Sequence, residues 1–405
     1  MATVAGPSAT GTGLTAVSTG RIASLDLLRG AVMVIMALDH TRDFFTNLTF
    51  EPESLPQTWM ALFLTRWITH FCAPLFFFLA GTGAFYYGAR RTPSALSRFL
   101  LTRGVWLMVV EFTLVGTAWT FTAPWGFFGV IWCLGMSMVV LAALVRLPVR
   151  WLAVSSAAVV LLHDLSDAYR PGPGTWTWVW RMLHVKGGVS IFGMHSFVLF
   201  PLMPWFAVMA LGFCFGALLQ RPDKRKWLLR LGVSLTLAFV LLRSTNLYGN
   251  PPALPGGVTP GDFHIQPTLE KTVILFLDTE KYPPSLQFLL MTLGPSFLLL
   301  AAVERYGIPR WVRPVVVFGR VPFFFYVLHL YLIHALAVVV AMAFHQPYSW
   351  LLHGGFWLNE WPDGYGHGLA FVYLAWAAVV AILYYPCARF AKKKEQKKSW
   401  WLSYL

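Results

Sequence analysis

The sequence predicts an all-α fold, a polytopic bundle of about ten transmembrane helices. Of the 405 residues, 57% are hydrophobic and only 12% are charged, and the mean hydropathy is +0.61. A soluble domain typically carries about twice that share of charged residues. Apolar runs of about 20 residues, enough to cross the hydrocarbon core as a helix, recur along the chain. Together these observations exclude a soluble globular protein.

Ten apolar segments have the length and composition of spanning helices, although the fifth is short. We place them at residues 24–45, 60–88, 98–120, 124–147, 150–164, 197–219, 226–246, 283–303, 314–343 and 366–390. An eleventh span, around Trp176–Gly193, is left open because that segment is more polar than the others. The tryptophans of this region favour a position at the lipid interface over sugar binding.

The distribution of basic residues predicts the orientation of the bundle. With the N-terminus inside, the inner segments carry 23 of the 31 lysines and arginines. The outer loops at 47–58 and 346–364 carry none. Because basic residues favour the cytoplasmic side, we expect the N-in, C-in orientation and an even number of spans. The net charge of +14 is then explained by membrane topology, and we expect no nucleic-acid partner.

The two ends of the chain differ from the apolar region between them. Residues 1–20 are small and polar and lack the basic start of a signal peptide, so we interpret them as a disordered tail. Residues 21–391 form the transmembrane domain, and residues 392–405 form a basic cytoplasmic tail that we expect to bind anionic lipid. The four cysteines lie one per apolar segment without a CxxC pair, which indicates buried thiols.

The first span carries charged residues, which are rare inside a membrane and usually face a bundle interior or a polar cavity. Each residue of an α-helix turns about 100°, so Asp26, Arg29, His40 and Asp43 share one face. Arg29 is expected near the cytoplasmic end and His40 about 16 Å further along the axis, toward the outer end. Asp43 or Asp39 is placed to orient the His40 ring. This face predicts a functional site.

Two further spans add ionisable groups. Arg66 and His70 are four residues apart in the outer half of the second span and therefore share a face. His329 lies on the ninth span, where a functional role and simple hydrogen bonding between helices remain equally open. Hydrogen bonding between helices is the favoured interpretation for Glu111, His163, His334 and His345. No HxxxH or HExxH spacing occurs, so we expect no metal site.

Several segments resemble a known family of membrane enzymes. The ten residues between Arg29 and His40 resemble the Arg-x10-His signature of the acyltransferase-3 family. Five longer segments resemble the catalytic region of heparan-α-glucosaminide N-acetyltransferase and its bacterial relatives, and the resemblance covers roughly residues 21–391. These segments are Arg21–Gly30, Pro74–Gly81, Ile131–Met138, Lys281–Leu286 and Gly319–His329.

The resemblance implies a transmembrane acyltransferase in the inner (plasma) membrane that uses cytoplasmic acetyl-CoA and modifies an amine or hydroxyl of a sugar across the membrane. One difference bears on the catalytic residue. The lysosomal enzyme has Asn where His40 stands, and its catalytic His lies in the following outer loop. Here that loop, 47–58, contains no His. His40 therefore fits the acyltransferase-3 pattern, and the lysosomal role cannot be assigned to a matching residue.

The leading hypothesis is acyl transfer from a CoA thioester to a sugar-like acceptor on the outer side. His40 acts as general base or carries the acyl group itself, with Asp39 and Asp43 fixing its tautomer. His70 is a further catalytic candidate, and Arg66 and His329 are candidates for acceptor binding. The expected contacts to the phosphates of acetyl-CoA come from the cytoplasmic side. The residues assigned to this cofactor site are Asp26, Arg29, Arg90, Arg91 and Arg103.

Two other classes remain open. A proton-coupled transporter or exporter of a small solute also uses intramembrane Asp, Arg and His, and it predicts substrate flux without consumption of CoA. No inverted repeat is evident, which weighs against it. A non-catalytic membrane scaffold would not need ionisable groups along one helical face. The sequence does not decide the acceptor, the acyl chain or whether the chain forms a homodimer.

Overall fold

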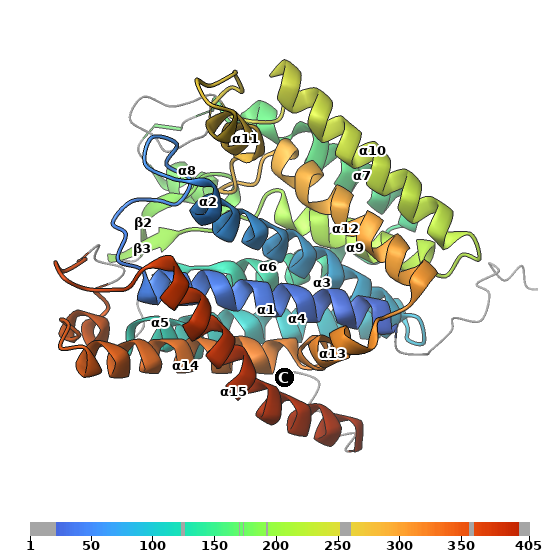
Figure 1. The fold of residues 1–405 in the computed structure, drawn as a ribbon. Coiled ribbons are helices and arrows are strands. Elements are labelled where there is room, and N and C mark those ends of the chain that lie inside the picture. The colour runs from blue at the N-terminus through green and yellow to red at the C-terminus, as the bar shows by residue number, and fades with distance from the viewer. Residues whose placement is uncertain are drawn as a thin grey trace, which may run out of the picture.

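A computed structural model describes residues 22–122, 126–169, 171–172, 174–191, 193–251, 261–355 and 360–396. The predicted tail at 1–20 and residues 397–405 of the predicted basic tail lie outside the described residues. Most of the described residues are helical, and the long helices pack side by side into one bundle (Figure 1).

The first half of the chain begins with a single long helix, α1 (Ala23–Phe45), followed by helices interrupted by short turns. Thr92 caps α4 by accepting from the backbone N–H of Ala95, and Pro93 occupies the first turn, where its missing N–H removes no hydrogen bond. The elements are α2 (Met60–Trp67), the 3-10 turn η1 (Ile68–Phe71), α3 (Cys72–Gly88), α4 (Pro93–Val110), the π-helical turn η2 (Glu111–Val115), α5 (Gly116–Thr120), β1 (Gly126–Phe128), α6 (Val130–Leu144), α7 (Val149–Leu162) and η3 (His163–Ser166).

The second half contains the remaining long helices and most of the small sheet. The elements are α8 (Thr175–Leu183), β2 (Gly187–Ile191), β3 (Met194–Val198), α9 (Trp205–Leu218), α10 (Lys224–Thr245), α11 (Leu269–Leu277), α12 (Leu286–Tyr306), η4 (Arg310–Val312), α13 (Arg313–Arg320), α14 (Pro322–Ala343), η5 (Ser349–His353) and α15 (Leu369–Gln396). Ser285 caps α12 by accepting from the backbone N–H of Phe288.

The described residues contain seven helical runs that are long and apolar enough to cross a membrane: 60–88, 93–120, 149–166, 224–245, 286–306, 322–343 and 369–396. The chain is therefore a multi-pass membrane protein. The helices α6 and α9 are apolar but shorter, and α1 carries the charges described above. Each of the ten predicted segments contains a helix, but crossing by all ten and the N-in, C-in orientation stay predictions.

The structure corrects four details of the predicted fold. The fold is not purely α-helical, because β1 pairs with β3 in parallel and β2 pairs with β3 antiparallel. The open eleventh span is instead α8 followed by β2, both too short to cross. The predicted span 314–343 is two helices, since the backbone leaves helical geometry at Val321 and restarts at Pro322. The helix α15 continues to Gln396, so the predicted tail begins as helix.

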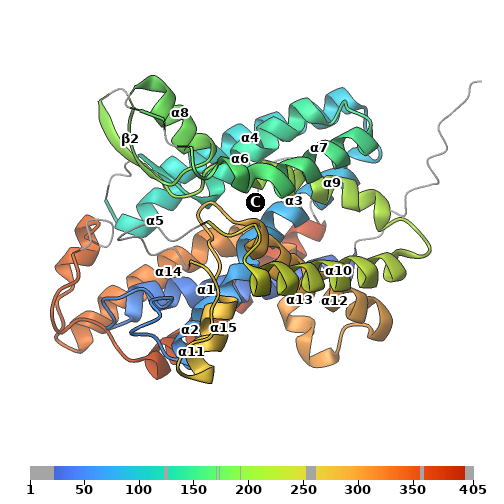
Figure 2. The ribbon, with the colours of Figure 1, turned by 90° about the horizontal axis from the view of Figure 1, so that it is seen from above.

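The helix α1 lies at the centre of the bundle and packs against α3, α12, α13, α14 and α15. In the view from above, α4, α6 and α7 lie on the far side of α3 from α1, and α14 and α15 lie beside α1 (Figure 2). The sheet and α8 lie near the end of the bundle where α1 ends (Figure 1). The charged residues of α1 are therefore enclosed by protein, as the predicted functional face requires.

Two glycines allow α1 to touch α13 backbone to backbone. A Cβ atom on Gly30 would lie 2.0 Å from the carbonyl oxygen of Val315, and one on Gly319 would lie 1.8 Å from the carbonyl oxygen of Asp26. Small residues at such contacts let membrane helices approach closely, where packing and not the hydrophobic effect holds them together. This contact fixes the position of α1 along α13.

Substitution Gly30→Ala is expected to lower stability by about 1–3 kcal/mol, because the added methyl group forces α1 away from α13. Thermal unfolding in detergent, followed by tryptophan fluorescence, measures the effect. The matched control is Gly368→Ala, where an added Cβ has no neighbour within 4 Å. Equal melting temperatures for the two variants would contradict the close contact.

Candidate functional site

A cavity of about 410 Å³ lies at the C-terminal end of α1. Its wall comes from α1 and the loop after it, α2, η1, the start of α3, η2, α5, β1, the start of α6, α14, the segment after β3 and the segments that precede β2 and α12. A concentration of ionisable groups inside a membrane bundle marks a functional site. The charged and imidazole side chains of the wall are Asp39, His40, Arg42, Asp43, Glu51, Glu53, Arg66, His70, Glu111, Lys186, Asp278, Glu280 and Lys281.

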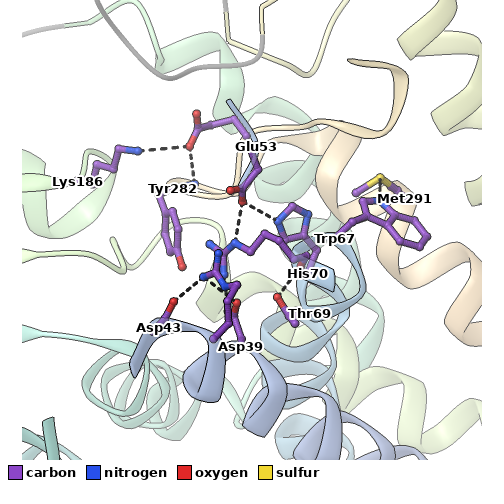
Figure 3. Close-up of polar contacts among 12 residues, drawn as sticks. Asp39, Asp43, Glu53, Trp67, Thr69, His70, Lys186, Tyr282 and Met291 are labelled. Carbon is purple, nitrogen blue, oxygen red and sulfur yellow. Dashed lines mark hydrogen bonds and ion pairs between the residues drawn. The ribbon is translucent and has the colours of Figure 1, made fainter. Parts of the chain in front are cut away.

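Five residues predicted for the site line this cavity: Asp39, His40, Asp43, Arg66 and His70. The structure thus brings the first and second predicted spans together at one place. Figure 3 shows Asp39 and Asp43 on α1 pointing toward Glu53 and His70, with side chains joined by dashed contacts between the two pairs. The predicted shared face of Arg66 and His70 is confirmed, since both side chains contact Glu53.

A buried network of alternating charges joins α1 to α2 and to the loop between them. The guanidinium of Arg66 donates to Asp39 through one nitrogen, and its Nε donates to Glu53 Oε1 at 2.7 Å. Arg42 lies 3.1 Å from Asp39 Oδ1 and 2.5 Å from Asp43 Oδ1. Breaking such a buried network by removing one member leaves uncompensated charge. The network therefore holds the end of α1 against α2.

The loop residue Glu53 is held in its ionised form. Burial disfavours its charge, but the attraction of Arg66 outweighs burial and, together with the nearby His70 ring, holds the pKa of Glu53 well below its usual range. His70 Nε2 lies 3.5 Å from Glu53 Oε1. His70 thus contributes to the polar wall from the 3-10 turn between α2 and α3.

The segment before α12 closes the cavity with two more carboxyl groups. Burial raises the pKa of Asp278 well above its usual range, and the nearby Glu53 carboxylate adds to the shift. Burial also raises the pKa of Glu280 although Lys186 lies 3.7 Å away, and Glu280 accepts from the backbone N–H of Tyr282 at 2.9 Å. These groups favour binding a proton or a cationic ligand at neutral pH.

The hydrogen-bond partner of His40 differs from the prediction. His40 Nδ1 lies 2.7 Å from Nε2 of His329, and the two rings are nearly parallel with centroids 5.0 Å apart. Among the described residues, neither Asp39 nor Asp43 is hydrogen-bonded to His40, because Arg42 and Arg66 engage both carboxylates. The prediction that an aspartate fixes the His40 tautomer is therefore wrong. His329 is thus the ring neighbour of His40.

The predicted cofactor residues do not share the cavity with His40. Arg29 lies eleven residues before His40, which is about 16 Å along the helix axis. Its guanidinium contacts Asp26 at 3.3 Å and donates to the carbonyl oxygen of Leu79 at 3.1 Å. None of the predicted cofactor residues lines the described cavity wall. The described cavity therefore does not reach these residues, and acetyl-CoA binding by them stays a prediction. They are Asp26, Arg29, Arg90, Arg91 and Arg103.

Three of the four residues interpreted as structural do join separate elements. Glu111 accepts from the backbone N–H of Trp132 at 3.0 Å, and it also lines the cavity. His163 contacts the carbonyl oxygen of Pro284 at 2.9 Å, and His334 contacts that of Ala118 at 2.8 Å. His345 is different, because it is exposed in a turn after α14.

Several residues of the cavity wall have no functional signal in the sequence. Lys186 and Lys281 come from loops about 95 residues apart, and their ammonium groups lie 5.6 and 5.1 Å from the centroid of the Tyr282 ring. The segment beginning at Lys281 was noticed only as part of a family resemblance. A charged residue in a loop gives no periodic signal, so only the folded chain places it next to α1.

The fold and the cavity define the class of protein. It is a multi-pass membrane protein with a cavity lined by ionisable side chains at one end of its helices. A family model described as heparan-alpha-glucosaminide N-acetyltransferase, catalytic, matches residues 21–245, which is more than half of the chain. The chain belongs to this family and is a membrane acetyltransferase, as the sequence resemblance indicated. No curated protein matches the chain. The match includes His40, Arg66 and His70, whereas His329 and Lys281 lie beyond it.

Substitution Arg66→Met is expected to destabilise the protein by about 3–5 kcal/mol, because Asp39 and Glu53 would lose a shared buried cation. The measurement is the melting temperature in detergent. Arg221→Met is the matched control, since Arg221 pairs with Asp223 in an exposed position and its loss is expected to change nothing measurable. Similar shifts for both variants would show that the network is not stabilising.

Substitution Asp278→Asn is expected to raise stability at neutral pH. The pKa of Asp278 in the folded protein lies above its unfolded value of 3.8. The protonated carboxyl therefore contributes stability that is fully present below pH 3.8, and this contribution is lost as pH rises through the folded pKa. The neutral amide avoids this loss. Between about pH 5 and pH 8, the melting temperature of Asp278→Asn should exceed that of the wild type by an amount that grows as pH rises. The exposed Asp363→Asn is the control, and a variant less stable than the wild type at pH 8 would contradict the expectation.

Proposed function

We propose that this membrane acetyltransferase moves an acetyl group from acetyl-CoA to an amine or hydroxyl of a sugar-like acceptor, with His40 as the general base. The observation that carries the proposal is the position of His40, an imidazole on the wall of a buried polar cavity in a chain of this family. Acetyl-CoA is the donor that the family uses. Imidazole is suited to general base catalysis because it exchanges protons near neutral pH.

The reaction uses His40 twice. Its unprotonated ring nitrogen removes a proton from the acceptor N–H or O–H while the acceptor atom attacks the thioester carbonyl carbon. The tetrahedral intermediate then breaks its C–S bond, and the protonated His40 returns the proton to the departing CoA sulfur. The products are the acetylated acceptor and CoA thiol, and the enzyme is unchanged. Direct acetylation of His40 is the alternative route to the same products.

Cations near His40 support the proposed chemistry. Lys281 lies on the same cavity wall, and its ammonium can stabilise the negative oxygen of the tetrahedral intermediate. Arg66 is engaged by Asp39 and Glu53, so we assign it to holding the wall and not to binding the acceptor. Asp278 and Glu280 line the same cavity, and their carboxyl groups are the proposed contacts of an acceptor amine.

The two substrates approach from different ends of the bundle in this proposal. The acceptor enters the cavity at the C-terminal end of α1, on the outer side of the plasma membrane. The phosphates of acetyl-CoA bind on the cytoplasmic side, where Arg29, Arg90, Arg91 and Arg103 are the proposed contacts. The long, thin pantetheine arm carries the thioester along the helices toward His40.

Substitution His40→Gln is expected to lower kcat about 10²–10⁴-fold, because it replaces the basic imidazole by a polar amide that cannot take up a proton. The assay follows CoA thiol release by purified protein in detergent, with glucosamine as the acceptor probe and acetylated product measured by mass spectrometry. The exposed His264→Gln is the matched control and should keep full turnover.

Two results would count against the proposal. Full turnover by folded His40→Gln would remove His40 from the base role. Flux of a solute into proteoliposomes without any consumption of acetyl-CoA would favour a transporter instead. Acetyl-CoA sealed inside proteoliposomes and acceptor supplied outside would test the sidedness directly.

A further inference from the structure

We propose that His329 is a positioning residue that fixes His40 in the tautomer whose Nε2 is the base. This inference deepens the proposed function and rests on it. The pair takes the place of the histidine and carboxylate of hydrolytic triads, with a neutral imidazole as the group that orients the catalytic ring.

The first step concerns the proton on His329. Its side chain is completely buried on α14, and its Nδ1 lies 3.0 Å from the carbonyl oxygen of Phe325, one turn earlier. A carbonyl oxygen only accepts hydrogen bonds, so Nδ1 of His329 must carry the hydrogen. The ring is nearly parallel to that of Phe325, with centroids 5.2 Å apart, and it meets the edge of Tyr326. These contacts hold the ring in one orientation.

The second step concerns the charge on His329. Its partners in the described structure are a backbone carbonyl and a second imidazole, and neither is anionic. A buried cation without an anionic partner is costly, so the neutral imidazole is the stable form. Because Nδ1 holds its single proton, Nε2 of His329 can only accept.

The third step assigns the proton on His40. Nδ1 of His40 lies 2.7 Å from this accepting nitrogen and must therefore donate to it. The neutral His40 then has its lone pair on Nε2, the nitrogen that the base role needs. The edge contact with Trp119, with centroids 5.0 Å apart, and the stacked His329 ring restrict rotation of the His40 ring.

Among the described residues, the carboxylates near His40 do not accept a hydrogen bond from its ring. Asp39 is paired with Arg42 and Arg66, and Asp43 is paired with Arg42. When His40 takes up a proton during the reaction, its Nδ1–H remains bonded to His329, so the ring does not need to move. Positioning by His329 also explains why a second histidine is buried at this depth on a separate helix.

The test compares two amide side chains of different length, Gln and Asn, at position 329. In His329→Gln the amide oxygen takes the place of Nε2 and can accept from His40, whereas the shorter His329→Asn places its amide near the position of Nδ1. We expect His329→Gln to keep kcat within about tenfold of the wild type. His329→Asn should lose about 10²–10⁴-fold in kcat with KM for acetyl-CoA unchanged, because the tautomer of His40 is no longer fixed.

A second measurement does not depend on turnover. Nitrogen-15 NMR of histidine-labelled protein in detergent, with His40→Gln used to assign the His40 signals, reports which ring nitrogen carries the proton. The wild type and His329→Gln should show a protonated Nδ1 and an unprotonated Nε2 for His40, and His329→Asn should show a mixture of tautomers. His334→Gln is the control on the same helix, since its ring contacts carbonyl oxygens of Ala118 and Leu351 and not His40.

Each outcome is decisive. Equal loss of kcat in folded His329→Gln and His329→Asn, or a wild-type His40 protonated on Nε2, would overturn the positioning role. A selective loss in His329→Asn with the expected spectra would support it. If the wild type transfers no acetyl group but its spectra show the expected tautomer, the proposed function fails while the orientation of His40 by His329 stands.

Discussion

The structure depends on one buried cation, the Arg66 guanidinium between Asp39 on α1 and Glu53 in the following loop. Charged groups at this depth are unfavourable unless each is paired, and the alternation of acid and base satisfies them in series. The same contacts bring the end of α1, the α2–η1 segment and the loop around one space. The cavity therefore exists because the charges that surround it stabilise one another.

The charges of the network leave His40 free for a different partner. Since Asp39 and Asp43 are committed to arginines, the ring of His40 is oriented by His329 from α14. The close backbone contact at Gly30 and Gly319 holds α1 against α13, directly before α14 in the chain. Helix packing at one end of α1 and ion pairing at the other thus set the position of the same imidazole.

The length of α1 separates two tasks. His40 lies on the cavity wall, whereas Arg29 lies about 16 Å away and contacts Asp26 and the backbone of α3. A donor as long as acetyl-CoA can connect these places, because its phosphates and its thioester are far apart. A helix with ionisable groups at both ends suits the proposed reaction, in which the two substrates come from opposite sides of the membrane.

The sequence by itself determined the helical membrane class, the approximate helix positions and the polar face of α1 that carries His40, because hydrophobic length and helical periodicity are local properties of the chain. It also predicted that Arg66 and His70 share a face. Tertiary structure alone decided that His329 meets His40 and that Lys281 joins the wall. These features depend on contacts between residues up to several hundred positions apart, and no local pattern specifies which distant side chains meet.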